Sequence, residues 1–92
     1  MNKATIISKK RGKAYGNYAN QSSIAQRLKS TISSGKNWSS MPPEHRESLD
    51  MIATKISRLV NGDHSDKDTW LDIAGYANLI HNSLDGDKNE EG

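Results

Sequence analysis

Apolar residues recur with helical spacing in three separate segments of the chain. In the first segment they lie four residues apart, at Ile24, Leu28 and Ile32. Asn20 or Ser22 is suited to cap a helix before this stripe, and Gly35 to end it. The pattern predicts a first helix over about 21–33.

The second segment has the most regular stripe, with apolar residues at helical intervals: Leu49, Ile52, Ala53, Ile56, Leu59 and Val60. Two prolines and Glu44 precede it, and these residue types favour the first turn of a helix. Asn61 and Gly62 are typical of a helix end. The pattern predicts a second helix over about 43–60.

The third stripe follows Asp68, a residue suited to cap a helix, and comprises Trp70, Ile73, Ala74, Ala77, His81 and Leu84. It predicts a helix over about 68–84 with Trp70 as an anchor in the core. Two long helices joined by about seven residues favour an antiparallel hairpin. We therefore expect an all-α, three-helix domain in which the first helix lies across the seam of this hairpin.

The chain divides into three parts by its pattern. Residues 1–18 show no helical period, contain two glycines and predict an irregular basic N-terminal arm. Residues 19–84 form the helical domain, and the small, acidic segment 85–92 is expected to be disordered. Length also indicates one domain, because 92 residues are too few for two independent cores.

Charge is divided unevenly along the chain. Residues 1–38 contain eight Lys and Arg and no acid, whereas residues 39–92 contain eleven acids and five bases. One interpretation is a basic region that binds an anionic partner, such as a nucleic acid or an acidic protein. The other is that the two halves neutralise each other across the fold.

Composition excludes several classes of protein. The chain has no cysteine, so a disulfide framework and a thiolate zinc site are excluded. Its apolar runs are too short for a membrane span or a secretory signal. We expect a cytoplasmic protein with a thin core.

The basic arm is the main candidate binding region. It combines four clustered bases with two tyrosines, and two further bases follow on the first predicted helix: Lys9, Lys10, Arg11, Lys13, Tyr15, Tyr18, Arg27 and Lys29. Bases interleaved with aromatic residues are typical of phosphate contacts combined with base stacking. Tyrosines that only dock the arm on the helices produce the same pattern.

Acidic residues offer an alternative chemistry, since Glu47, Asp68 and Asp72 are oxygen ligands of the kind that magnesium prefers. The register of an antiparallel hairpin, however, places Lys55 near Asp72 and Arg58 near Asp68, which favours two structural ion pairs. His45, His64 and His81 share no metal-ligand spacing. We therefore predict no catalytic residue, no metal and no cofactor.

Gly75 lies inside the third predicted helix, where glycine costs about 1 kcal/mol relative to alanine. We expect something to pack close to its backbone, either the first helix or a second copy of the chain. A homo-oligomer is therefore one possible form of the protein.

Several strings resemble a family of small uncharacterised proteins found mostly in tailed phages and prophages. They are Arg11 with Tyr15-Gly16, Asn20-Gln21-Ser22, Asn37-Trp38, the Lys-x-x-Arg string at 55–58, and DTWLDIAGYANL at 68–79. The paired acidic helices also resemble, more remotely, the all-helical magnesium-dependent nucleotide pyrophosphohydrolases. The chain departs from that pattern, because Lys55 and Arg58 occupy the middle of the equivalent stripe.

The resemblance implies a phage-type accessory protein acting in the bacterial host cell. With the basic arm, it predicts a non-enzymatic binder that inhibits a host defence complex handling nucleic acid, or that sequesters a nucleotide. The alternative is a magnesium-dependent nucleoside triphosphate pyrophosphohydrolase.

Overall fold

The computed structural model of the protein describes residues 14–91, with the side chains of residues 14–84, and the described part is all-α. Its elements are α2 (Tyr18–Ser33), the short 3-10 helix η1 (Trp38–Ser40), α3 (Pro43–Asn61) and α4 (Lys67–Glu91). This confirms the predicted all-α fold with three helices.

Two helices begin earlier than the sequence pattern predicts, because other residues cap them. α2 begins at Tyr18, and the Asn17 side chain accepts a hydrogen bond of 3.1 Å from the Asn20 backbone N–H. At the start of α4, the Asp66 carboxylate accepts bonds from the Thr69 backbone N–H at 3.2 Å and from its hydroxyl at 2.5 Å. The caps are therefore Asn17 and Asp66, each of which accepts from the residue three positions on.

The sequence pattern predicts the end of α3 accurately but not the end of α4. α3 begins at Pro43 and is closed by Gly62, whose N–H donates to the Arg58 carbonyl at 3.0 Å. α4 does not end at Leu84 but continues through the acidic segment to Glu91, a stretch with one glycine and no proline. Within residues 14–91 no helix combines the length and apolar character that a membrane crossing requires.

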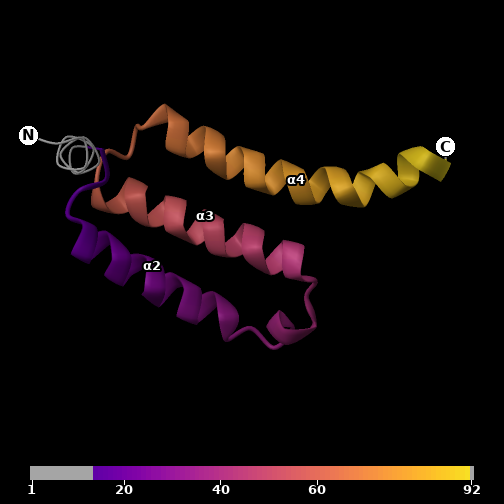
Figure 1. Ribbon diagram of the computed structural model, residues 1–92, viewed down its shortest axis with the longest axis horizontal. Coiled ribbons are helices and arrows are strands. Elements are labelled where there is room, and N and C mark those ends of the chain that lie inside the picture. Colours follow the sequence, from indigo (N-terminus) through magenta and orange to yellow (C-terminus); the bar gives the residue numbers. More distant parts are fainter. Residues whose placement is uncertain (1–13, 92) are drawn as a thin grey trace, which may run out of the picture.

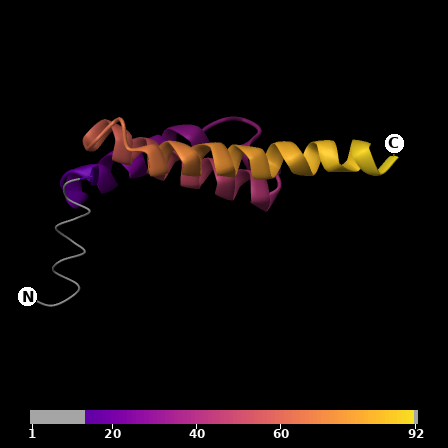
Figure 2. The same cartoon turned by 90° about the horizontal axis from the view of Figure 1, so that it is seen from above.

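The three helices lie side by side in one layer, with α3 in the middle (Figure 1). α3 and α4 form the predicted antiparallel hairpin. α2, however, packs on the side of α3 away from α4 and does not cross the seam, so that expectation was wrong. Seen from above, the layer is narrow, and α4 extends beyond the other two helices (Figure 2).

The core is small, and much of it is polar. Among the described residues, only Ala25, Ala53 and Leu59 are buried apolar side chains. Ser57 is fully buried, where its hydroxyl accepts a 2.8 Å bond from the Gln21 amide and donates to the Thr54 carbonyl. α2 is held on α3 through these small and hydrogen-bonded residues, which explains why it lies flat beside α3 rather than across the hairpin.

Trp70 is not the core anchor that the sequence predicts. More than half of its surface is exposed, and its indole N–H donates to the His64 carbonyl at 2.7 Å. The neighbouring Thr69 takes the buried position instead. Trp70 therefore fastens the turn between α3 and α4, which suits an aromatic ring whose N–H needs a partner.

Gly75 has open space around it. A Cβ built on it would meet nothing within 4 Å, so the first helix does not pack on its backbone, contrary to one of the two expectations. Replacing Gly75 by Ala should raise the free energy of unfolding by about 1 kcal/mol, because alanine has the higher helix propensity. Urea denaturation followed by circular dichroism measures this change. A loss of stability would show that this backbone is covered.

Candidate functional site

The chain leaving the basic arm is fixed to the end of α3. The Asn61 side-chain amide donates to the Tyr15 carbonyl at 2.9 Å and to the Asn17 carbonyl at 3.0 Å. The Asp63 backbone N–H donates to the Ala14 carbonyl at 2.7 Å. Residues 14–17 are therefore held at one point of the layer, where α2 begins and α3 ends.

Two glycines permit this close approach. Gly16 has a φ of +79°, a left-handed conformation, and a Cβ there would overlap the Asn61 carbonyl oxygen. A Cβ on Gly62 would overlap the Ala14 carbonyl oxygen and the Tyr15 Cα. The sequence analysis used Asn61 and Gly62 only as a helix end and missed this anchor. Two glycines could have indicated this close contact, because each follows a residue that takes part in it: Tyr15-Gly16 and Asn61-Gly62.

The two tyrosines near the arm have different roles. The Arg58 guanidinium carbon lies over the Tyr15 ring, 4.6 Å from its centroid, a cation–π contact that covers one face of the ring. This places Tyr15 in the docking role that the sequence left open. Tyr18, at the first position of α2, is 78% exposed and has the ring that remains accessible to a partner.

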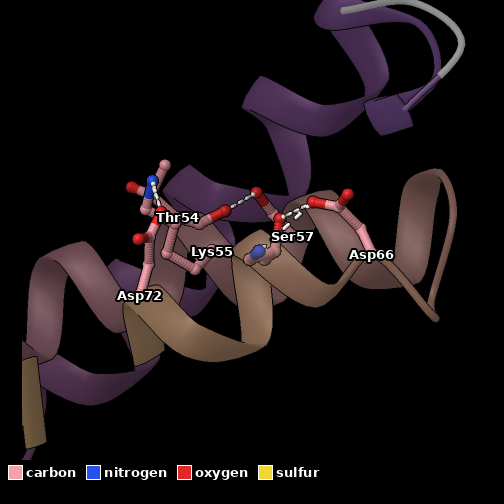
Figure 3. A network of polar contacts seen from close by, with 6 residues as sticks. Thr54, Lys55, Ser57, Asp66 and Asp72 are labelled. Carbon is pink, nitrogen blue, oxygen red and sulfur yellow. Dashed lines mark hydrogen bonds and ion pairs between the residues drawn. The ribbon is translucent and has the colours of Figure 1, made fainter. Parts of the chain in front are cut away.

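One of the two predicted ion pairs forms. The Lys55 ammonium lies 3.0 Å from an Asp72 carboxylate oxygen, joining α3 to α4 beside the polar contacts of Thr54, Ser57 and Asp66 (Figure 3). The second predicted ion pair, between Arg58 and Asp68, does not form. Its guanidinium contacts Tyr15 instead, and Asp68 is exposed.

The Lys55 and Asp72 side chains are 12% and 47% exposed, so their interaction is partly screened by water. In a double-mutant cycle of Lys55→Met and Asp72→Asn, we expect a coupling free energy of about 1 kcal/mol or less. Urea denaturation of the four proteins measures it. Strictly additive effects would show that the pair contributes nothing to stability.

The alternative magnesium ligands do not come together. Glu47 lies on α3, Asp68 in the first turn of α4, and Asp72 is paired with Lys55. Among the residues whose side chains are described, no three His, Cys, Asp or Glu lie close enough to hold a metal ion. His45, His64 and His81 are likewise on three different parts of the fold.

The predicted basic residues fall into two groups. Lys9, Lys10, Arg11 and Lys13 lie outside the described residues. Arg27 is exposed on α2, with its Nε donating to the Ser23 carbonyl at 3.3 Å. Lys29 is half-buried beside a shallow hollow that Trp38 and Asp50 also line.

The arrangement of the layer keeps Arg27 and Lys29, the two described bases of α2, away from the acids of α4. α2 and α4 lie on opposite sides of α3 (Figure 1). In the part of the chain with described side chains, the ion pair between Lys55 and Asp72 is the only one, so Arg27, Lys29 and Lys36 have no acidic partner there. The bases of α2 are thus separated from the acids of α4 by α3, which has three acids and three bases.

The turn that anchors the arm carries a carboxylate of its own. The Ser65 hydroxyl and backbone N–H donate to the Asp63 carboxylate, at 2.6 Å and 2.9 Å, and hold the pKa of Asp63 below its usual range. A lowered pKa in the folded state adds stability above the ordinary pKa of Asp, and this is lost as the pH falls through the lowered value. At neutral pH the hydrogen bonds from Ser65 to the Asp63 carboxylate therefore stabilise the turn.

Fold and site together define a small all-α protein in which residues 14–17, directly after the basic N-terminal segment, are anchored at one end of a three-helix layer. The chain belongs to the DUF6378 family, a domain of unknown function, whose model matches residues 1–84. No curated protein and no solved structure matches the chain significantly.

Proposed function

We propose that the protein acts by binding, and that its basic N-terminal half engages the phosphates of a nucleic acid, within a host complex that handles nucleic acid. The observation that carries this proposal is the separation of the bases of α2 from the acids of α4. If these charges neutralised each other, α2 would face α4, but α3, which has three acids and three bases, lies between them. The bases of α2 therefore remain without acidic partners among the described side chains.

The anchor supports the same function. Residues 1–13 contain five Lys and Arg and no acid, and the chain that follows them is fixed by Asn61, Gly62 and Asp63. The arm therefore starts from a defined place beside Tyr18, whose exposed ring is available for stacking on a base. Bases spread along an arm and a helix match the repeated charges of a phosphate backbone better than the compact charge of one nucleotide.

The direct test uses fluorescence anisotropy with labelled single-stranded DNA and RNA. Replacing Lys9, Lys10, Arg11 and Lys13 by Ala should weaken binding at low salt by at least tenfold, because four phosphate contacts are lost. The matched comparison is Lys9→Ala, Lys10→Ala against Lys67→Ala, Lys88→Ala, since each variant loses two bases, and the pair from the acidic half should change the affinity much less. Equal effects of the two variants would contradict a role for the arm.

Tyr18→Ala tests the stacking contact separately. It should weaken binding about tenfold, since base stacking contributes about 1–3 kcal/mol, and should leave the circular dichroism spectrum unchanged because the ring is exposed. An unchanged affinity would remove Tyr18 from the binding surface.

Release of pyrophosphate tests the enzyme alternative. That alternative rests on the remote resemblance to nucleotide pyrophosphohydrolases. Incubation with each nucleoside triphosphate and magnesium should release no pyrophosphate if the protein acts only by binding. Release that is lost in Glu47→Gln and Asp68→Asn would establish the enzyme instead.

A further inference from the structure

One side of the helical layer is apolar. Leu49 and Ile52 of α3 and Ala77 and Ile80 of α4 line a groove of about 210 Å³ between the two helices. Positions seven residues apart return to nearly the same side of a helix. The stripe of Leu49 and Ile56, with Val60 one turn on, therefore borders the groove from α3, and the stripe of Trp70, Ala77 and Leu84 borders it from α4.

These stripes are unusually open to solvent. Val60 is 66% exposed and Leu84 57%, and Leu49, Ile56 and Trp70 are exposed as well. None of the groove-lining or stripe residues is Lys, Arg, Asp or Glu. We call this surface, made of the groove and its two bordering stripes, the apolar face.

The ion pair between Lys55 and Asp72 lies on the other side of the α3–α4 hairpin. Lys55 is six residues from Leu49, about 120° round α3, and Asp72 is five residues from Ala77, about 140° round α4. Their ion pair therefore joins the helices on the side away from the groove. The groove side of α3 and α4 is therefore apolar and uncovered, whereas helical domains ordinarily bury an apolar side between two layers.

We propose that the apolar face is covered by a second copy of this chain, forming a twofold-symmetric dimer. A copy presents the same face, so apolar side chains of one cover those of the other, as an isologous contact requires. A nucleic acid does not suit this face, because its stripes carry no base to neutralise phosphate. The proposal does not depend on the proposed function, which uses the arm and α2.

The size of the face agrees with this occupant. With 19 residues, α3 is about 28 Å long. The two helices that form the face are about 8–10 Å apart and each about 10 Å across, so the face is about 20 Å wide and covers roughly 560 Å². Two copies would together bury about 1,100 Å², which exceeds the roughly 1,000 Å² of a specific interface and suits a weak, reversible dimer. The three buried apolar side chains among the described residues also leave the single layer with little core of its own.

Sedimentation equilibrium of the full chain from about 1 to about 300 µM tests the dimer, since association depends on concentration. We expect a reversible equilibrium between monomer and dimer. The double variant Val60→Glu, Leu84→Glu should shift the dissociation constant upward at least a hundredfold. Both residues are exposed in the monomer, so circular dichroism should show that the helices persist.

The matched control is Leu71→Glu, Leu79→Glu, two exposed leucines turned at least 120° away from Ala77 on α4. These changes should leave the dimer intact. Loss of the dimer in the control, but not in the test variant, would place the contact on the outer edge of α4 beside Gly75 and overturn the proposal. A monomer at every concentration would overturn it as well.

Cross-linking keeps the proposal testable if the double variant does not fold. The chain has no cysteine, so Ile56→Cys introduces a single thiol on the middle helix of the apolar face. A flexible bismaleimide should link it to its copy in high yield, whereas Leu79→Cys should remain monomeric. The opposite pattern, or no dimer from Ile56→Cys, would contradict the proposed face.

Discussion

Replacing Ala53 by Asp is expected to unfold the protein. Ala53 has no exposed surface, and it lies on α3, the helix that contacts both of the others. A carboxylate there would have to be buried between the packed helices, and an unpaired buried charge costs more than about 4 kcal/mol. Small domains have total stabilities near the lower end of 5–15 kcal/mol, so most of the helical circular dichroism signal should be lost.

The control for this change is Asn78→Asp, which places the same carboxylate on an exposed position of α4. It should alter the free energy of unfolding by about 0.5 kcal/mol or less. A folded Ala53→Asp protein with an unchanged urea midpoint would show that α2 does not pack on α3 as the structure has it.

Gly62→Ala should strongly destabilise the contact between residues 14–17 and the end of α3. The added methyl group overlaps the Ala14 carbonyl and the Tyr15 backbone, so residues 14–16 must move away from α3. The Asn61 and Asp63 hydrogen bonds and the Tyr15 contact with Arg58 would be weakened together. We expect a loss of about 2–4 kcal/mol, measured by urea denaturation.

Gly75→Ala is the natural comparison, because it makes the same chemical change where no atom lies within 4 Å of the new Cβ. Gly75→Ala should raise the free energy of unfolding, whereas Gly62→Ala should lower it. If Gly62→Ala were neutral, the close contact between the arm and the end of α3 would be contradicted.

The helices could be predicted from the sequence because each depends on local signals. The regular stripe of α3, its leading prolines and Gly62 place that helix within one residue of its observed ends. The caps were less predictable, since Asn17, Asn20 and Ser22 all suit the start of α2 and only the path of the chain around Gly16 selects Asn17.

The position of α2 could not be predicted, because an apolar stripe shows that a helix has a partner but not which side of the partner it takes. The side is decided by small and polar residues, Ala25, Ala53 and the bond between Gln21 and Ser57, which a hydrophobic pattern does not detect. For the same reason the pattern placed Trp70 in the core, although its ring closes the turn.

The candidate site was predicted in part. Helix register brought Lys55 to Asp72, since both residues lie in regular, neighbouring helices. The same register failed for Arg58, because its partner is Tyr15, 43 residues away and on none of the three helices that the pattern predicted. Contacts with residues outside the predicted helices follow no helical period, and only the two glycines indicated this one.

The salt dependence of nucleic-acid binding tests the central claim most directly. Each phosphate neutralised on a single strand contributes about 0.7 to the slope of log affinity against log salt concentration, so binding through four arm residues should produce a slope of about −3 or steeper. Replacing Lys9, Lys10, Arg11 and Lys13 by Ala should flatten that slope by about 3. An affinity and a slope that are the same in both proteins would contradict binding through the basic arm.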